Sequence, residues 1–370
     1  MDKYNTISAF NKWLLPICLE KCSNSSKKAL SSFDAYRKKL DFKALLSLLL
    51  YAINEEKESL RDLSAALTHC PLQQEIGIES ISHSQLSRSL TALDPLILEE
   101  IFQQLLQTAH KKTKPTKRNS LYLIDSSTFS LSLKRHQWAS FRKTKAGVKL
   151  HLTLCFMDEE TMYPSDFTLT NAKEHDVNQL KTLVNQAEAT YVFDRGYLDF
   201  ERMDQMHQEG YFFVTRIKKN TKYHVFESFE TPADQKTLIL SDQHVALGAK
   251  NSLTSRFRLV TIEDEKGKFL QFITNRFDLS AEEVAQAYKS RWQIELFFKH
   301  IKQHMTIKNF FSQSEIGVHN QLILTMIAAL LTFLIKLETK TAKSVFQIKR
   351  LFRYLIFESF EEWFLRLVPS

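Results

Sequence analysis

Two short apolar runs, each ending in an aspartate, constrain the fold of this chain more than any other feature. Leu121-Tyr-Leu-Ile is followed by Asp125, and Ala189-Thr-Tyr-Val-Phe is followed by Asp194. Runs of this length and composition are typical of buried strands. Side chains just past the ends of buried strands gather at one edge of an α/β sheet, so we expect Asp125 and Asp194 to meet there.

The order of the expected elements after residue 120 indicates a fold class. Val148–Phe156 alternates like a strand, and a third strand is expected near Met162–Leu169. A helix over Asp176–Ala187 then precedes the second aspartate run, and a helix over Phe200–Gln208 and a strand over Tyr211–Thr215 follow it. This order is that of a ribonuclease H-like core, which predicts an α/β fold.

Two further stretches complete the expected layout around the α/β core, residues 121–310. Between about residues 220 and 275, strand-like runs such as Arg256–Ile262 and Phe269–Thr274 indicate a β-rich insertion. The most apolar run, Leu322–Ile335, falls short of the roughly 20 residues needed to cross a bilayer. We therefore expect a buried core helix within a helical C-terminal region, 311–370, and no membrane segment.

The first 110 residues read as a helical domain. The segments Ser59–Leu67 and Ser82–Leu90 resemble the paired helices of a helix-turn-helix, with Ser82 as an N-cap. Two ordinary packed helices are the simpler alternative, because the link between the segments exceeds the usual turn of about 3 to 4 residues. If the domain binds DNA, Gln85 and Arg88 on the second segment are candidate contacts.

Positive charge is concentrated in one stretch of the sequence. The chain has 50 Lys and Arg against 42 Asp and Glu, a net charge of +8. From His110 to Lys149 there are eleven Lys and Arg residues and a single acid, Asp125. Residues 111–120 are basic, lack large apolar side chains and are interpreted as a linker between domains. This charge pattern favours a polyanionic partner.

Composition excludes several functional classes. With seven glycines, the chain has no Gly-rich loop of the kind that cradles nucleotide phosphates. The four cysteines form no Cys-x2-Cys pair, so neither a zinc module nor a disulfide framework is expected. The opening residues lack the charged and apolar regions of a signal peptide, and we therefore expect a cytoplasmic protein.

A helix expected from Ser280, which opens a capping box, to about His304 carries the most specific pattern. Its polar residues stand at relative positions 0, 3, 7 and 14, which a rotation of roughly 100° per residue places on one face. Trp292 borders this stripe. The stripe consists of Tyr288, Arg291, Glu295 and Lys302. An intrahelical ion pair contributing about 0.2 to 0.5 kcal/mol is the simpler interpretation of Glu295 when the helix is considered alone.

The spacing Tyr-x2-Arg-x3-Glu-x6-Lys resembles the signature of bacterial insertion-sequence DDE transposases, the insertion-sequence-four group with its Tyr-Arg-Glu-Lys (YREK) motif. Leu123–Thr128 is similar to the first-aspartate region of this family, and Val192–Tyr197 to the second. The resemblance covers about residues 120 to 310. One departure is clear: some relatives use a tryptophan of the insertion to hold a flipped base, and this chain has none between Trp138 and Trp292.

The resemblance implies a chemistry and a substrate. Asp125, Asp194 and Glu295 would be catalytic and would hold two Mg²⁺ ions, for which Mn²⁺ would substitute, about 3.5 to 4 Å apart. The substrate would be double-stranded DNA, both element ends and target, bound by a homodimer. Arg291 and Lys302 would grip phosphates. Tyr288 would bond to the DNA backbone and Trp292 would stack on a distorted base.

Two alternatives to a transposase remain open. A nuclease of the same fold would cut DNA without joining it, and a non-catalytic derivative would only bind DNA. The presence of all three acids argues against a decayed enzyme. His175, next to Asp176 at the start of an expected helix, invites a catalytic interpretation, but a helix cap or a core role is the simpler one.

Overall fold

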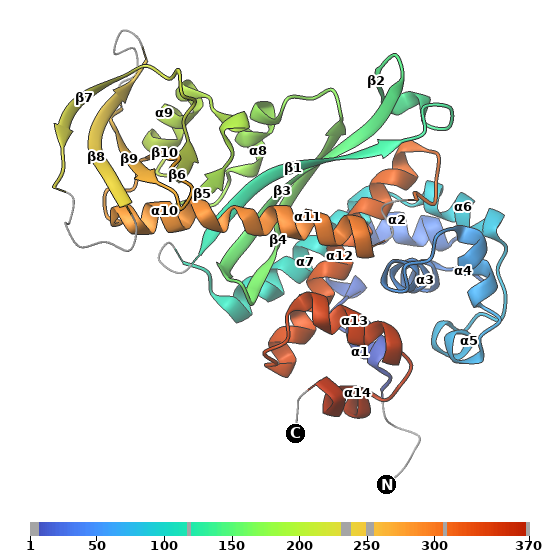
Figure 1. Cartoon of the computed structure of the whole chain (residues 1–370). Helices are drawn as coiled ribbons and strands as arrows, with labels where there is room; N and C mark the ends of the chain where they lie inside the picture. The colour runs from blue at the N-terminus through green and yellow to red at the C-terminus, as the bar shows by residue number, and fades with distance from the viewer. Residues whose placement is uncertain (1–6, 117–119, 231–237, 249–254, 306–308, 368–370) are drawn as a thin grey trace. The chain divides into compact units, whose positions relative to one another are not determined.

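The computed structural model describes residues 7–116, 120–230, 238–248, 255–305 and 309–367 (Figure 1). The chain divides into two compact units. Unit 1 comprises Met1–Lys114, Phe129–Gly147 and Phe298–Ser370, and unit 2 comprises Pro115–Thr128 and Val148–Phe297.

A long apolar helix, α12 (Glu315–Thr339), forms the core of unit 1. Its most apolar 18-residue window has a mean hydropathy of 2.0 and is 89% buried within the protein, which agrees with the expected core helix. Helices α3, α6 and α7, which precede α12 in the sequence, pack against it, and so does α13, which follows it. The helices of unit 1 are α1 (Ala9–Leu14), α2 (Asn24–Asp34), α3 (Phe42–Asn54), α4 (Leu60–Ala66), α5 (Cys70–Ile76), α6 (His83–Ala92), α7 (Pro95–Thr113), α12, α13 (Val345–Leu355) and α14 (Phe360–Leu367).

The two amphipathic segments near the N-terminus form α4 and α6, which contact each other. The predicted N-cap is confirmed, because the Ser82 hydroxyl accepts a hydrogen bond of 3.3 Å from the Gln85 backbone N–H. A third helix, α5, separates α4 from α6, so the pair differs from a helix-turn-helix with one tight turn. Helix α7 continues to Thr113, and the start of the expected linker is therefore helical, while residues 117–119 lie outside the described residues.

A large mixed sheet forms the centre of unit 2, and its edge strand β2 falls within the 129–147 stretch of unit 1. Strands β1, β5 and β6 are neighbours and run parallel, whereas the strands beyond β6 are antiparallel. The order is β2-β3-β1-β5-β6-β10-β9-β8-β7, with β4 paired to β3. The strands are β1 (Leu121–Leu131), β2 (Ser140–Arg142), β3 (Lys145–Asp158), β4 (Thr161–Asn171), β5 (Thr190–Phe193), β6 (Phe212–Arg216), β7 (Tyr223–Ser228), β8 (Leu238–Leu247), β9 (Phe257–Glu263) and β10 (Phe269–Thr274).

The predicted β-rich stretch, about 220 to 275, forms β7 to β10. These strands do not build a layer of their own, because β10 pairs with β6 and so continues the sheet of the core. Helix α9 (Phe200–Gln208) and strand β10 have the predicted bounds. The large mixed sheet with its helices establishes a mixed α/β architecture.

Two helices differ from the sequence-based expectation. The helix expected over Asp176–Ala187 is a 3-10 turn, η3 (Asp176–Gln179), followed by the short α8 (Leu180–Leu183). It ends early because the backbone N–H groups of Asn185 and Gln186 donate to the Tyr191 hydroxyl, at 3.1 and 2.7 Å, instead of continuing the helix.

The helix expected from Ser280 to His304 is divided into α10 (Ala281–Ser290) and α11 (Trp292–His304), whereas its capping box is present as predicted. At the junction the Arg291 N–H bonds to the Tyr288 carbonyl and the Ile294 N–H to the Arg291 carbonyl, a tighter i to i−3 pattern. The helix therefore tightens locally at Arg291, the residue that carries the central side chain of the predicted stripe.

Candidate active site

The two predicted aspartates occupy equivalent positions on neighbouring parallel strands. Leu121 to Ile124 of β1 pair in register with Thr190 to Phe193 of β5. Asp125 and Asp194 are the next residues on each strand, so the register places them side by side at the carboxyl end of β5. Strand β1 itself continues to Leu131, beyond the end that the apolar run predicts.

The α10–α11 junction brings three residues of the predicted stripe to these aspartates. The Tyr288 hydroxyl donates to Asp194 Oδ1 at 3.5 Å. Arg291 Nη1 lies 3.6 Å from Asp125 Oδ2, and Arg291 Nη2 donates to Glu295 Oε1 at 2.6 Å. One guanidinium therefore joins two of the three predicted catalytic acids, while a tyrosine contacts the third.

Burial and mutual repulsion govern the charge of Asp125. Burial is the largest effect, and it raises the pKa of Asp125 to about 6. The Ser126 backbone N–H and the Arg291 guanidinium oppose this rise, whereas the negative charges of Glu295 and Asp194 add to it. Burial also raises the pKa of the Tyr288 hydroxyl, which therefore stays protonated and able to donate. The site is a partly desolvated group of acids that attracts cations.

The donor chemistry of this group suits a hard divalent cation, because three carboxylates supply the oxygen ligands that Mg²⁺ prefers. Arg291 already acts as the shared cation of Asp125 and Glu295. Among the described residues, however, no three Asp, Glu, His or Cys side chains stand close enough together to hold a metal ion as they are. An ion held by all three acids would require their side chains to come closer together than they stand here.

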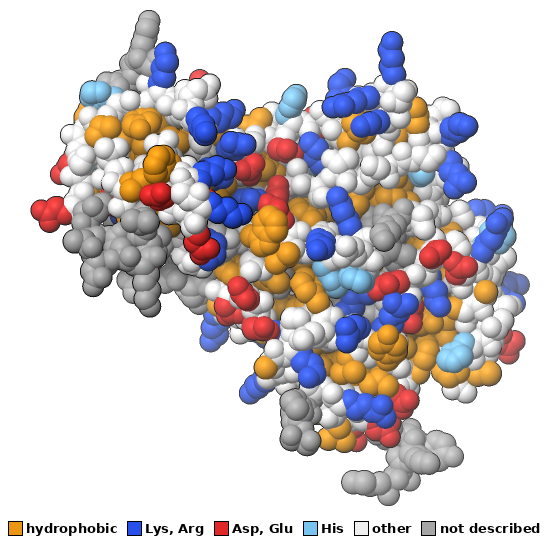
Figure 2. All heavy atoms as spheres, in the orientation of Figure 1, with side chains coloured by type: hydrophobic (Ala, Val, Ile, Leu, Met, Phe, Trp, Pro, Cys, Tyr) orange, Lys and Arg blue, Asp and Glu red, His pale blue; other side chains and the backbone are white. Residues whose placement is uncertain are grey.

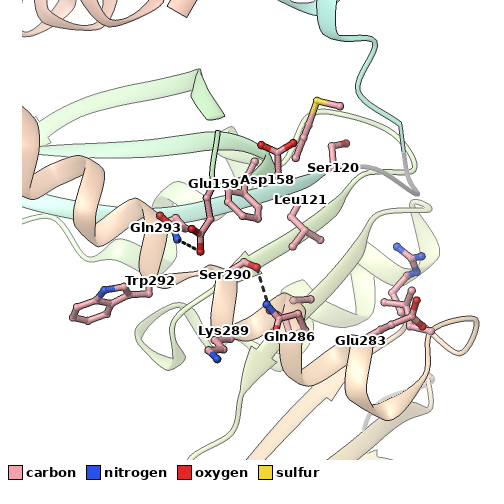
Figure 3. A pocket seen from close by; sticks show the side chains of 15 residues that line it. Ser120, Leu121, Asp158, Glu159, Glu283, Gln286, Lys289, Ser290, Trp292 and Gln293 are labelled. Carbon is pink, nitrogen blue, oxygen red and sulfur yellow. Dashed lines mark hydrogen bonds between the residues drawn. The ribbon is translucent and has the colours of Figure 1, made fainter. Parts of the chain in front are cut away.

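Trp292, the residue that borders the stripe, is 57% exposed at the start of α11. It lines a pocket of about 720 Å³ whose other walls include Leu121 and the turn between β3 and β4. In Figure 3 the Trp292 ring extends outward from the helix, while Gln293 points to Glu159, at 3.4 Å. An exposed aromatic face is thus available next to Arg291.

Three of the predicted DNA-contacting residues belong to unit 1. The Lys302 amino group lies 5.0 Å from the centre of the Phe129 ring, and burial lowers its pKa. Gln85 and Arg88 on α6 line a separate cleft. Within unit 2, the structure gathers one group of predicted residues around the aspartates. The gathered residues are Asp125, Asp194, Tyr288, Arg291 and Glu295.

The sequence interpretation missed a polar network that adjoins Asp125. Asp176 accepts hydrogen bonds from Ser126 Oγ at 2.7 Å and from Lys149 Nζ at 3.1 Å. Its neighbour His175, which did attract attention in the sequence, makes no side-chain cap bond. The only sequence signal was an acid at the start of an expected helix, which is also typical of an ordinary helix terminus.

Basic and acidic side chains lie next to each other on the visible face of unit 2. Figure 2 shows acidic side chains beside a group of Lys and Arg side chains, over the part where Figure 1 places β5 and the α10 and α11 helices. Such a surface combines sites for cations with attraction for a polyanion.

Comparisons with known proteins bear on this arrangement. Residues 116–331 match the family model described as "Transposase DDE domain". A protein of Geobacillus stearothermophilus, named as a transposase for insertion sequence element IS5377, is 29% identical over 272 residues, which are 73% of this chain and 71% of that protein. Transposase y4zB of Sinorhizobium fredii is 30% identical over 236 residues, 63% of this chain and 65% of its own.

A third relative, from Synechocystis sp., is named as a transposase for insertion sequence element IS4SA and is 24% identical over 267 residues, 68% of this chain and 71% of that protein. The family match runs from the residues before β1 into α12 and contains the gathered acids. Since that match spans more than half of the chain, this protein belongs to the transposase DDE domain family.

Proposed function

We propose that this protein is the transposase of a bacterial insertion sequence of the insertion-sequence-four, or YREK, group. It would bind the terminal inverted repeats, cleave the element ends and join the 3′-hydroxyl to target DNA. One observation carries the proposal: Arg291 lies between Asp125 and Glu295 where a parallel strand pair delivers Asp194 beside them. The transposase names of the relatives support the same function.

Asp125, Asp194 and Glu295 would be the catalytic residues and would hold Mg²⁺, with Mn²⁺ as a substitute. When bound, two such ions would activate water or a 3′-hydroxyl and stabilise the leaving oxygen. The protein's own groups prepare the site. Tyr288 orients Asp194 by donating a hydrogen bond, and Arg291 neutralises part of the repulsion between Asp125 and Glu295. Near DNA, the same guanidinium would turn to a phosphate.

Contacts to the scissile region would come from the same helices. Trp292 presents an exposed ring on which a base could stack. Lys302, in the last turn of α11, would contact a phosphate. Tyr288 would add a hydrogen bond to the DNA backbone. These contacts are independent of sequence, so they position the strand without selecting it.

Residues 1–110 would recognise the element ends. A cleft of about 550 Å³ between the loop after α2 and helix α6 is lined, among the described residues, by four basic side chains and no acid. Arg37 is fixed there by stacking 3.9 Å from the Phe33 ring centre and by a hydrogen bond to Ser89 of α6. The lining includes Tyr36, Arg37, Lys38, Lys39, Gln85 and Arg88. Such a surface suits a phosphate backbone, with Gln85 and Arg88 placed on α6 to reach base edges.

The remaining parts of the proposal concern organisation. The core would be ribonuclease H-like over 121–310, with 111–120 as linker and 311–370 as C-terminal helices. The enzyme would act as a homodimer on double-stranded DNA, in the cytoplasm at the nucleoid. The parallel strands β1, β5 and β6, with Asp125 on β1 level with Asp194 just after β5, support a core of this type.

Two assays with purified protein test the function. A duplex carrying the inverted repeat from the DNA that flanks this gene is incubated with Mg²⁺ and scored for end cleavage. A pre-cleaved end is then incubated with a plasmid target and scored for joined product. Cleavage and joining together support the transposase. Cleavage without joining would identify a nuclease, and binding without either would identify a non-catalytic derivative.

A further inference from the structure

We infer that Asp176 is a positioning residue that fixes the catalytic carboxylate of Asp125 through Ser126. The inference rests on the proposed function, because it assigns Asp125 to metal binding. Asp176 lies at the start of η3, outside the acidic triad, and neither the family pattern nor the stripe on α10 and α11 includes it.

The first link joins Asp176 to Ser126 across 50 residues of sequence. Ser126 Oγ donates to Asp176 Oδ1 at 2.7 Å, a short hydrogen bond to a charged acceptor. The second link joins Ser126 to its neighbour, since the Ser126 backbone N–H donates to Asp125 Oδ1 at 2.8 Å. Asp176 thus holds the residue whose N–H orients the carboxylate. A shift of Ser126 would move that N–H and turn Asp125 away from its present position.

Other groups hold Asp176 in place. Lys149 of β3 donates to Asp176 Oδ1 at 3.1 Å and to the Glu174 carbonyl at 2.7 Å, so it ties both the side chain and the preceding turn to the sheet. The Lys149 side chain is 14% exposed and Asp176 is 32% exposed, so water screens this pair only in part. A charged hydrogen-bonded pair at this depth gives a fixed anchor for Ser126.

A buried histidine, His151, lies next to the Asp176 carboxylate. His151 is fully buried, and burial lowers its pKa to about 4, so its ring is neutral near pH 7. Its Nε2 is 2.8 Å from the Thr170 hydroxyl, which fixes the ring, while Nδ1 lies 3.5 Å from Asp176 Oδ1. Among the described residues, the Asp176 carboxylate thus accepts from one cation, Lys149, and from one hydroxyl, that of Ser126.

Hydrogen-bonded partners behind a metal ligand orient the ligand, and their loss weakens metal binding by about 10- to 100-fold. A purely structural role for Asp176, tying η3 to β3 through Lys149, predicts a loss of stability without a change in metal affinity. The two roles are separable because metal affinity can be measured on the folded full-length protein.

The test measures Mn²⁺ binding to the full-length protein by electron paramagnetic resonance of the free ion, without DNA or catalysis. Ser126→Ala and Asp176→Asn should each weaken binding at the Asp125-dependent site by about 10- to 100-fold. Ser126→Thr, which keeps a hydroxyl, should restore most of the affinity. The double variant Ser126→Ala with Asp176→Asn should bind Mn²⁺ with about the affinity of the single variant that binds it more weakly. Both substitutions remove the same hydrogen bond, so their effects should not add.

Matched controls separate positioning from general damage. Asp166→Asn removes another half-buried carboxylate of unit 2, one that accepts hydrogen bonds from Phe167 and Asn185, and it should leave Mn²⁺ affinity within about twofold of wild type. Ser165→Ala removes a buried hydroxyl that bonds to the Thr153 carbonyl and should behave in the same way. All variants are compared at a temperature where circular dichroism shows them folded.

The outcomes distinguish the inference from the function on which it rests. If Asp125→Asn abolishes Mn²⁺ binding while Ser126→Ala and Asp176→Asn bind like wild type, Asp176 is only structural and the inference is overturned. Additive losses in the double variant would also overturn it. If Asp125→Asn itself leaves Mn²⁺ binding unchanged, the metal-site assignment of the proposed function fails as well.

Discussion

Arg291 donates a 2.6 Å hydrogen bond to Glu295, four residues further along the chain and across the junction between α10 and α11. The same guanidinium lies 3.6 Å from Asp125, which stands far earlier in the sequence, on β1. A local helical ion pair and a long-range contact therefore share one cation. This relationship defines what each side chain of the site should do when it is changed.

Replacing the glutamate tests its role most directly. Glu295→Gln keeps the shape but removes the charge, so cleavage and joining should both fall by at least about 100-fold if Glu295 helps to hold metal and stabilise the transition state. Binding to end DNA, measured by mobility shift, should persist or tighten, because a carboxylate that repels phosphate is gone.

A nearby acid provides the control for this variant. Glu282 lies in the first turn of α10, outside the gathered residues, and Glu282→Gln should change cleavage by less than about twofold. An exposed ion pair contributes only about 0 to 1 kcal/mol, so near wild-type cleavage by Glu295→Gln would reduce the residue to that role and remove it from the triad.

Removing the shared cation should make stability depend on divalent ions. Arg291→Met keeps a long side chain but leaves the acids unneutralised, so in EDTA at pH 8 we expect the protein to lose about 1 to 3 kcal/mol of stability. Adding Mg²⁺ should recover much of that loss, because the ion replaces the missing positive charge. Thermal melting of the variant and wild type, with EDTA and with Mg²⁺, measures both effects. A deficit of equal size in the two conditions would contradict the shared-cation role.

The acidity of Asp125 predicts a pH dependence with a definite sign. Its folded pKa, raised to about 6 by burial, exceeds the ordinary value of 3.8, so the protonated form favours the fold. This contribution is fully present below about pH 4 and is lost as pH rises through 6, a change on the order of 3 kcal/mol. The Asp125→Asn side chain is uncharged at every pH, so the stability of this variant does not include this pH-dependent contribution.

Melting curves in EDTA from pH 4 to pH 8 check this sign. The melting temperature of Asp125→Asn, taken relative to wild type, should rise between pH 4 and pH 7 and then level off. A difference that stays constant with pH, or that falls, would mean that Asp125 is not the buried acid responsible. Metal affinity of the wild type should also decrease below about pH 6, because the ligand must lose its proton.

The basic cleft of unit 1 should provide salt-dependent DNA binding. Removing one lysine or arginine that neutralises a phosphate should reduce the slope of log K against log salt by about 0.9. Lys38→Ala, Lys39→Ala and Arg88→Ala should each reduce it by roughly this amount, whereas Lys28→Ala, an exposed lysine of α2 outside the cleft, should not. Unchanged slopes for all three cleft variants would place the DNA elsewhere.

Point substitutions suit this question better than removal of residues 1–110. Helix α12 is buried against α3, α6 and α7, all of which belong mainly to that stretch, so their removal would expose its apolar surface. Binding by a truncated protein would then report misfolding as much as the absence of the DNA-binding side chains. Substitutions in the cleft leave this core intact.

The sequence alone predicted the features that depend on local pattern. Hydrophobic runs located β5, β10 and the core helix α12, because periodicity reports which side chains an element must bury. The two aspartates came together as expected, since parallel pairing in register carries equivalent positions of two strands to the same level. The capping box likewise located the start of α10.

Only the tertiary structure decided what these residues touch. The expected helix after Asp176 ends at Leu183 because Tyr191, on a later strand, captures the next backbone N–H groups. Asp176 bonds to Ser126, which lies 50 residues earlier in the sequence. Arg291 contacts Asp125, and most of the strands of the sheet lie between these two residues in the sequence. Periodicity along one element determines which face is polar, but a hydrogen bond between distant elements depends on how those elements pack. The sequence therefore predicted the positions of the acids, whereas the packing decided that Arg291 contacts two of them and that Asp176 bonds to Ser126.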